Sequence, residues 1–567
     1  MESTPASGPA ADSSQARDHL PGPRQIGFVA LGLGLLAAGA SLALFGASGR
    51  DDPYITFSAA EAIIQNRQLV NINGDAIEQS TTLLLTLLLA VLGWLTGASI
   101  PILGWLIGFL ALAAITPTAY AILGHNLTES RALTAAVVVT MTPPLMYWSA
   151  SGAEQSLAVL LTLILVLLLR QLSTRREHRW AMPAAAVTSL LIFLSRPDLG
   201  LSALAATGVL AFLTAIRHQH ILAIRLGVLT ALQALLVLVT SVGRLSVTGS
   251  PLPQPLSAKV GTNLIEQVSR GIGYFVTNVL SPWFVVLLLV SGVVLWSTRF
   301  RTLTVGNSFL LLNASALIAG TILSGGDWME LGRFFAAPAT FVVLAIFSFP
   351  QGLSPRRFVI ASSALLISQI GTLLYWSVSP VSVDSRGSNV LNRWELDATG
   401  SPGVPRSLST PFNRWNADHL GDSYFVGAAV PAVKAVLEND PTMQFTIASG
   451  QGGLIPYVLR QEFGDRIRFI DRFQLMTNDF AECNLVAGTY GSFISWNQWE
   501  KLAGQCAPPL PDMVFSIGPI PFDDLGDDYE VVVHVQGSAV QGESSLPQEQ
   551  WLAVKRDYVG RAATPLS

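Results

Sequence analysis

Charge is scarce in this sequence. Only 12% of its 567 residues are Asp, Glu, Lys or Arg, whereas 50% are hydrophobic. An ordinary soluble enzyme has about twice this share of charged residues, so the composition excludes that class and indicates an integral membrane protein. The net charge is −4, and no basic block is large enough to follow a phosphate backbone. Nucleic acid is therefore excluded as a partner.

The sequence also lacks a nucleotide-binding glycine pattern. Its "GQGG" stretch, Gly450 to Gly453, does not have the spacing of a dinucleotide or P-loop fingerprint, and we interpret it as a turn. No internal repeat is visible. Cysteine is nearly absent, because the chain contains only Cys483 and Cys506.

Long hydrophobic runs are what the sequence has in abundance. Residues 1–25 are rich in Ser, Ala, Pro and Gly and predict a disordered cytoplasmic tail. The apolar run that follows is longer than the core of a secretory signal, so we interpret it as a retained transmembrane helix that starts in the cytoplasm. We expect eleven full spans, near residues 26–46, 101–123, 132–148, 154–170, 180–195, 199–216, 226–243, 276–297, 303–323, 335–350 and 358–377.

One leucine-rich stretch decides the orientation of every later loop. The apolar part of this stretch, residues 83–95, would reach about 20 Å as a helix, but the hydrocarbon core is roughly 30 Å thick. We therefore expect an interfacial or re-entrant helix within a first outer loop, 47–100. With this choice the arginines of the inner loops, from Arg131 to Arg357, all lie on the cytoplasmic side, as the positive-inside rule requires.

The same count places residues 378–567 outside the plasma membrane, as a soluble extracytoplasmic domain after the membrane domain 26–377. Short β-strands are expected in "MQFTIASGQGGLIPYVL", "RIRFID" and "GDDYEVVVHVQGS", so the fold should be α/β or mixed. Both Cys483 and Cys506 lie in this domain. An oxidising compartment favours a disulfide between them, and two unrelated buried thiols are the alternative.

Two adjacent carboxylates, Asp51 and Asp52, directly follow the first span. Adjacent acids repel each other and gain nothing from packing, so we expect at least one to be functional. Lone acids such as Glu61 or Glu330 more often simply reach water. A carboxylate can accept the proton of an attacking hydroxyl, and Lys or Arg can stabilise a departing phosphate. Together these groups indicate transfer of a sugar from a lipid phosphate at the outer surface.

Six motifs, in order along the chain, carry a family resemblance. They are "DDPYIT", "NINGDAIEQSTT", "YWSASGAE", "SRPD", "GSPLPQPLSAKV" and "GGDWMELGRFFAAP". They resemble the GT-C polyprenyl-phosphate-dependent glycosyltransferases, and within that superfamily most resemble the terminal β-(1→2) arabinofuranosyltransferases of the actinobacterial cell wall. A weaker stretch, "GGLIPYVL...FIDRFQLMTND", extends the resemblance into the outer domain.

The resemblance implies a polytopic α-helical GT-C fold, decaprenyl-phospho-arabinofuranose as the donor, and the arabinan of arabinogalactan or lipoarabinomannan as the acceptor. It also implies that the outer domain holds the acceptor. No cofactor is firmly implied, although a divalent cation could bind at the acids. The implied residue roles are catalysis by Asp51 and Asp52, donor-phosphate binding by Lys259, Arg333 and Arg196, and substrate binding by Tyr54, Glu78, Trp148, Glu154, Asp198, Asp327 and Trp328.

Several alternatives stay open at the level of sequence. The stretches "FSAAEA" and "LPQP" depart from the family pattern, so another lipid-linked sugar and another acceptor (glycan, lipid or protein) remain candidates. A transporter would concentrate polar residues at the membrane midplane and often in repeated halves, and a wall-binding scaffold would leave the acid pair unexplained. The resemblance implies retention of configuration, which a carboxylate nucleophile would permit, whereas in-line attack assisted by a single base gives inversion. Asp51 and Asp52 could each serve as base, nucleophile or metal ligand.

Overall fold

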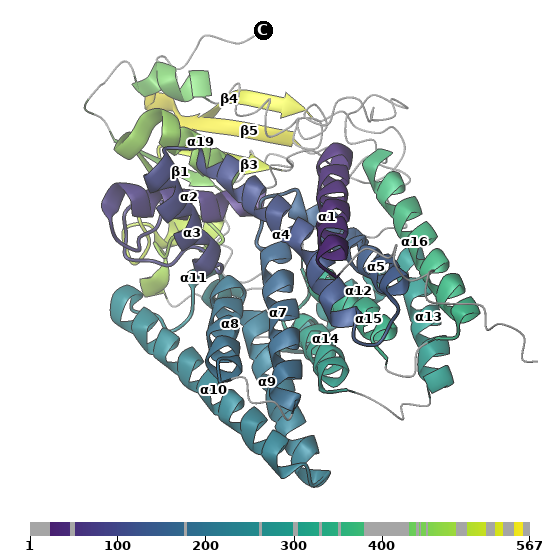
Figure 1. Cartoon of the computed structure of the whole chain (residues 1–567). Coiled ribbons are helices and arrows are strands. Elements are labelled where there is room, and N and C mark those ends of the chain that lie inside the picture. The colour runs from purple at the N-terminus through teal and green to yellow at the C-terminus, as the bar shows by residue number, and fades with distance from the viewer. Residues whose placement is uncertain are drawn as a thin grey trace, which may run out of the picture.

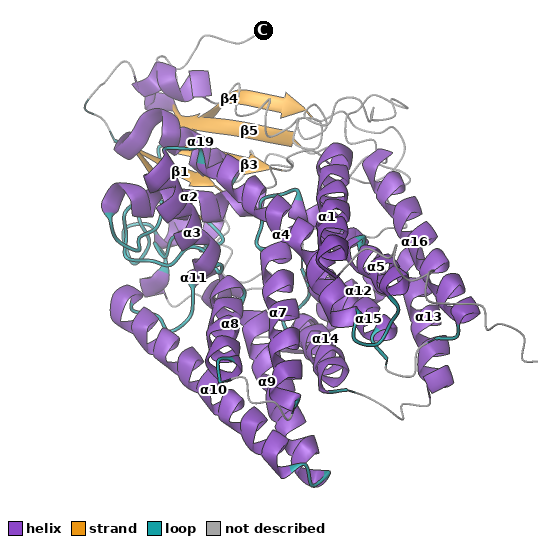
Figure 2. Ribbon diagram, viewed as in Figure 1, coloured by secondary structure: helices purple, strands orange, loops and turns teal. Residues whose placement is uncertain are grey.

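The molecule has a helical bundle with a small sheet domain at one end (Figures 1 and 2). A computed structural model provides the coordinates. It describes residues 23–45, 51–174, 179–259, 264–298, 304–327, 331–349, 353–378, 430–437, 442, 444–449, 452–483, 496–517, 528–536 and 549–558.

Seven helices among these residues are long and apolar enough to cross a membrane. They are α1 (Pro23–Phe45), α4 (Ile100–Leu123), α7 (Gln155–Ser173), α9 (Pro197–Ile216), α10 (His220–Thr248), α14 (Val305–Leu323) and α16 (Pro355–Val378). Their inner faces pack into one apolar cluster, whereas outer side chains such as Phe212 and Ile224 are about two-thirds exposed. Exposed apolar surface of this extent fits a hydrocarbon surrounding, so the chain is a polytopic membrane protein.

The remaining expected spans are shorter or broken. α12 (Leu264–Val279) and α13 (Pro282–Thr298) are bent by 83° against each other and would make an eighth span only if counted together. The expected span 132–148 is divided into α5 (Glu129–Thr140) and α6 (Pro143–Ser149). A proline cannot donate a backbone hydrogen bond and disfavours a helical residue before it, which explains both breaks. Two further apolar helices, α8 (Ala181–Ser195) and α15 (Ala336–Phe347), are short.

The leucine-rich stretch folds as α3 (Leu83–Thr96), a 14-residue helix that ends at Gly97 in the left-handed conformation. It packs beside α2 (Asp51–Asn66), at the end of the bundle that carries the sheet domain (Figure 1). Its length agrees with the prediction that it does not span. The expected sidedness of the loops remains a prediction.

The C-terminal domain, which we call the outer domain after its expected side of the membrane, is a mixed α/β fold, as expected. Its five-stranded sheet has the order β2-β1-β3-β5-β4, in which β1, β2 and β3 are parallel and β5 is antiparallel to both of its neighbours. The strands are β1 (Phe445–Ser449), β2 (Ile467–Asp471), β3 (Met513–Ile517), β4 (Tyr529–Gln536) and β5 (Glu549–Lys555). Its described helical segments are residues 430–437, α19 (Leu454–Phe463), α20 (Trp496–Leu502) and the one-turn 3-10 helices Gly464–Arg466 and Ala481–Cys483.

One expectation for this domain was wrong and another is confirmed. The "LIPYVL" stretch after the glycines is the helix α19, not a strand, because β1 and β2 are parallel and parallel neighbours need a crossover connection. Cys483 and Cys506 form the expected disulfide, with their Cα atoms 5.0 Å apart. This bond ties the turn at Cys483 to the segment after α20.

The outer domain rests on the first loop of the membrane half. The side-chain amide of Asn73 pairs with the edge strand β2, donating to the Phe469 carbonyl at 2.7 Å and accepting from the Phe469 N–H at 2.9 Å. Asn71 donates to the Met476 carbonyl at 3.1 Å. Apolar side chains of the first loop and α2, including Ile72, also belong to the core cluster of the outer domain. The edge strand is therefore covered rather than exposed.

Candidate functional site

Asp52 lies in the first turn of α2, where the positive end of a helix favours a carboxylate. Its Oδ2 is paired with Nη1 of Arg333, although the two residues are 281 positions apart in the chain. The side chains are 17% and 10% exposed, so the pair is largely shielded from solvent. The side chain of Asp51 is outside the described set, and its expected catalytic role remains a prediction.

Glycines shape the loop that delivers Arg333. Gly326 has a φ of +79°, and a Cβ at this position would lie 2.6 Å from Cβ of Tyr274. Gly332 has a φ of +66°, and a Cβ there would lie 2.5 Å from Oδ1 of Asn278. Only glycine fits such left-handed positions with so little space. Gly332 therefore allows a tight turn into the 3-10 helix Arg333–Phe335 (η1), which carries the guanidinium.

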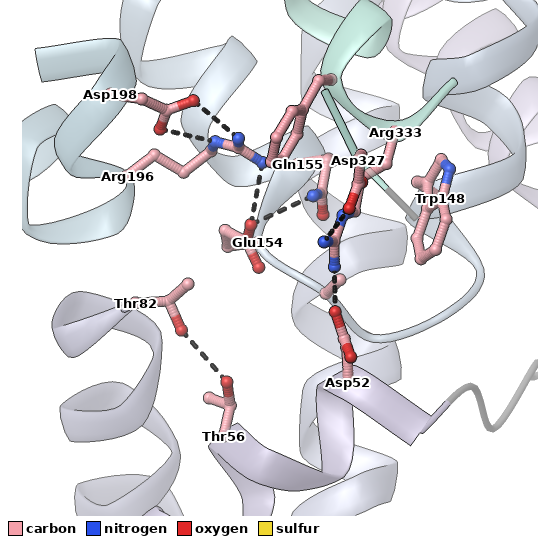
Figure 3. A network of polar contacts seen from close by, with 12 residues as sticks. Asp52, Thr56, Thr82, Trp148, Glu154, Gln155, Arg196, Asp198, Asp327 and Arg333 are labelled. Carbon is pink, nitrogen blue, oxygen red and sulfur yellow. Dashed lines mark hydrogen bonds and ion pairs between the residues drawn. The ribbon is translucent and has the colours of Figure 1, made fainter. Parts of the chain in front are cut away.

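Arg333 binds two carboxylates at once. Its Nε donates to Oδ2 of Asp327 at 2.7 Å and its Nη2 donates to Oδ1 at 2.8 Å, while Nη1 is used for Asp52 (Figure 3). The paired, planar geometry is the strongest form of an arginine–carboxylate contact. Trp148 of α6 lies under the same guanidinium, with its ring centroid 5.5 Å from Cζ. The guanidinium is thus held on three sides.

Arg196 forms a second group of the same kind. It sits between α8 and α9 in an extended conformation, as expected for the residue before a proline. Its Nε and Nη2 donate to Asp198 at 3.1 and 2.7 Å, and its Nη1 donates to Oε1 of Glu154 at 3.1 Å. Burial alone would lower the pKa of Arg196, but the carboxylates of Asp198 and Glu154 reverse the effect and raise it. Arg196 stays charged.

Phe334 joins the two arginine groups. The centroid of its ring lies 5.2 Å from Cζ of Arg196 and 5.3 Å from Cζ of Arg333, within cation–π range of both. Its backbone N–H donates to the Tyr274 hydroxyl at 3.4 Å, which orients the residue. Two guanidiniums therefore flank a single aromatic ring.

We call these residues the rim cluster: Asp52, Glu154, Arg196, Asp198, Asp327 and Arg333. Four carboxylates and two guanidiniums give a sum of −4 + 2 = −2 when all are ionised. Six of the expected site residues are thereby brought together from four separate parts of the chain, with Trp148 beside them. An anionic ligand would need to displace carboxylates from the arginines or bring further positive charge.

The chain resembles known proteins in its fold. No family model and no curated protein matches its sequence. The crystal structure of ArnT from Cupriavidus metallidurans bound to undecaprenyl phosphate is similar, with a TM-score of 0.52, 13% identity, and coverage of 95% of this chain and 99% of ArnT. The archaeal oligosaccharyltransferase AglB from Archaeoglobus fulgidus, in complex with an inhibitory peptide and a dolichol-phosphate, has a TM-score of 0.50, 12% identity, and coverage of 86% and 69%. The chain has the GT-C fold.

Within this GT-C fold, some expected site residues lie apart from the rim cluster. Both oxygens of the Glu78 carboxylate are bound by Arg244 of α10, at 2.7 and 3.1 Å, and the two side chains are 2% and 3% exposed. Tyr54 is buried and packs against Phe57 and against Tyr457 of α19. Trp328 is outside the described residues. Lys259 ends the short helix α11 (Gln254–Lys259), and its side chain is outside the described set.

Sequence reasoning missed several polar and aromatic neighbours of the cluster. Gln155 follows Glu154 directly and binds it, and Phe334 follows Arg333, so adjacency to a charged motif residue was the available signal. Three hydroxyls, those of Thr56, Ser80 and Thr82, lie 2.9 to 3.2 Å from one another and fasten the end of the first loop to α2. Thr56 is one helical turn after Asp52, on the same face.

The described side chains include no group of three or more His, Cys, Asp or Glu placed to hold a metal ion. The carboxylates of the rim cluster are each directed at a guanidinium instead. Binding of a divalent cation therefore remains a prediction.

Proposed function

We propose that this protein is a membrane glycosyltransferase that moves a sugar from a polyprenyl phosphate to a hydroxyl of a glycan at the outer face of the plasma membrane. The observation that carries the proposal is the pair of guanidiniums on one aromatic ring, one of them bound to Asp52. Guanidiniums bind phosphate by the same paired geometry that they use for carboxylate. The similar ArnT and AglB structures contain polyprenyl-type phosphates, which supports a lipid phosphate as the ligand.

The donor phosphate would compete with Asp52 for Arg333. Both are anions that accept from the same Nη1, and the phosphate of the donor lies next to the bond that breaks. Displacement from Arg333 would release the Asp52 carboxylate near the reacting carbon. Arg333 and Arg196 would then stabilise the charge on the departing phosphate. Asp52, no longer paired, could accept the proton of the attacking hydroxyl or attack the sugar itself.

These groups account for each bond, electron pair and proton of the transfer step. The bond between the anomeric carbon and the phosphate oxygen breaks, and its electron pair leaves with the polyprenyl phosphate. The acceptor oxygen bonds to the anomeric carbon, and its proton passes to a carboxylate, for which Asp52 is our choice. A single step of this kind inverts the anomeric centre; attack by the carboxylate itself, followed by the acceptor, retains it.

We further propose D-arabinofuranose as the sugar and a cell-wall arabinan as the acceptor. This choice is supported by the ordered motifs, from "DDPYIT" to "GGDWMELGRFFAAP", because four of them supply residues of the rim cluster. The position of the outer domain over the first loop supports its expected role in holding the glycan. Another lipid-linked sugar is the alternative.

The test is transfer by the purified full-length protein in detergent. Polyprenyl-phospho-arabinofuranose and an arabinan oligosaccharide should yield polyprenyl phosphate and an elongated oligosaccharide. Joint replacement of Asp51→Asn and Asp52→Asn should abolish both products, and Asp465→Asn, an exposed acid on the outer domain, should leave them unchanged. Full turnover by the double variant would refute the site. Transfer from a hexose donor alone would refute the sugar but keep the class.

A further inference from the structure

Gln155 is a buried amide in the centre of the rim cluster. It is the first residue of α7 and is 3% exposed. Its Nε2 donates to Oε1 of Glu154 at 3.0 Å, and the same oxygen accepts from Nη1 of Arg196 at 3.1 Å. Figure 3 shows the side chain between Glu154 and the Arg333–Asp327 pair. Gln155 thus adjoins both arginine groups.

The oxygen of this amide has no hydrogen-bond partner among the described residues. Among the residues that the structure describes, Oε1 of Gln155 is buried and accepts no hydrogen bond. Reversing the amide does not help, because the Glu154 carboxylate can only accept, so a reversed Oε1 would face another acceptor. A buried hydrogen-bond acceptor without a partner costs free energy. A ligand group that donates a hydrogen bond to Oε1 of Gln155 would remove this cost.

The chemistry of the expected ligand shows which of its groups could donate a hydrogen bond to Oε1. The phosphodiester of a polyprenyl-phospho sugar offers only acceptor oxygens at neutral pH, so it cannot satisfy Oε1. The hydroxyls of the sugar can donate, and the sugar is bonded to the phosphate that the neighbouring arginines would hold. We infer that Gln155 accepts a hydrogen bond from one hydroxyl of the donor sugar and so helps to select that sugar. This inference rests on the proposed function.

The test compares Gln155→Met, which keeps the size of the side chain and removes its polar atoms, with the parent full-length protein. Four donors are used: polyprenyl-phospho-arabinofuranose and its 2-deoxy, 3-deoxy and 5-deoxy analogues. The substitution should lower kcat/KM roughly 5- to 30-fold for the complete sugar and for two analogues. For the analogue that lacks the recognised hydroxyl, parent and variant should react at nearly the same rate.

A structural role of Gln155 would give a different result. If the variant loses the same factor with all four donors, the inference is overturned, because the amide then acts only through Glu154. Thr162→Val is the matched control: Thr162 is buried two turns further along α7 and bonds its own helix, so its effect should not depend on the donor. A parent protein that transfers no sugar from any polyprenyl phosphate would overturn both the proposed function and this inference. Normal parent transfer with a donor-independent loss overturns the inference alone.

Discussion

Two buried arginine–carboxylate pairs lie in this membrane protein, and we expect them to have different roles. Arg333 binds Asp327 through two nitrogens in the rim cluster, and Arg244 binds Glu78 through two nitrogens between α10 and the first loop. In each pair the arginine is at most 10% exposed and the acid at most 2%. Geometry and burial alone do not distinguish them.

The surroundings of the two pairs differ. Arg333 also binds Asp52 and shares the ring of Phe334 with Arg196, so charges of both signs accumulate around it. The Glu78–Arg244 pair is a one-to-one match, with no second ion pair to either residue among the described side chains. A neutral, isolated pair is enough to fasten a loop. A cluster with surplus charge has no such structural reason, and we therefore propose it as the functional site.

The largest expected effect is that of Asp52→Asn on catalysis. The substitution removes the group that would accept the proton or attack the sugar, so transfer should fall about 10²- to 10⁴-fold. Arg333 keeps its paired contact to Asp327, and the thermal midpoint should change little. Rates from radiolabelled donor and melting curves on the same samples measure both. A large fall in the midpoint with an unchanged rate would reverse our assignment of the two pairs.

Glu78→Gln should act on stability instead. It leaves the Arg244 guanidinium buried without its counter-charge, which costs about 3–5 kcal/mol in the free energy of unfolding. The double replacement Glu78→Leu with Arg244→Met should cost less than the single one, since it leaves no isolated charge. Transfer per folded molecule should stay within about threefold of the parent. A rate loss that exceeds the loss of folded protein would instead support the substrate-binding role that the sequence motif suggested.

Asp471 adds a third buried carboxylate, one satisfied by backbone N–H groups rather than by an arginine. It accepts from Phe473, Leu475 and Met476. Burial raises its pKa from 3.8 to about 6, and the hydrogen bonds limit the rise. The folded state thus binds the proton more tightly than the unfolded state. The stability that this provides is full below about pH 4 and is lost as the pH rises to about 6.

The prediction is that Asp471→Asn removes this pH dependence. Between pH 4 and pH 6 the parent should lose about 2 kcal/mol of unfolding free energy through this group, whereas the variant should not. Thermal midpoints at half-unit intervals of pH measure the difference, with Asp465→Asn as the exposed-acid control. Equal slopes for parent and Asp471→Asn would show that the carboxyl titrates normally.

The smallest effect concerns the charge balance of the rim cluster. Its surplus of two negative charges calls for another cation when an anionic donor binds, and Lys259 is the base that the sequence motif assigned to the phosphate. Lys259→Gln should raise the KM for the donor about tenfold and leave the KM for the acceptor unchanged, because a charge-assisted contact to phosphate is lost. An increase in the acceptor KM alone would move Lys259 out of the donor site.

The sequence predicted which polar residues would lie together better than it predicted the helices; their role as a functional site stays a prediction. Charged residues are rare in an apolar chain and stand out in its loops, so Asp52, Glu154, Arg196, Asp198, Asp327 and Arg333 could all be named in advance. The breaks before Pro143 and Pro282 were missed because hydropathy sums composition over a window and does not register a change of direction. Arg244 was missed because a single arginine near the end of a long apolar helix belongs to no motif.

The outer domain shows a similar limit. Its β1 and β2 were found from β-branched and aromatic residues, and α19 was mistaken for a strand because "LIPYVL" is short and apolar. The docking of Asn73 on β2 could not be predicted, since it depends on which strand forms the edge of the sheet. The disulfide was predictable because only one pairing exists for two cysteines.

The first loop also has a mechanical consequence. Gln79 accepts a hydrogen bond from the Ile72 N–H and donates one to the Ile55 carbonyl of α2. The first-loop segment that binds the outer domain is therefore hydrogen-bonded to the helix that bears Asp52. Glu78, which directly precedes Gln79, binds the same loop segment to Arg244 of α10. A pull on a polymer attached to the outer domain would be transmitted to α2 through these first-loop contacts, as well as to α16 through the chain that follows it. Tension in such a polymer would thereby become a load on α2, the helix that bears Asp52.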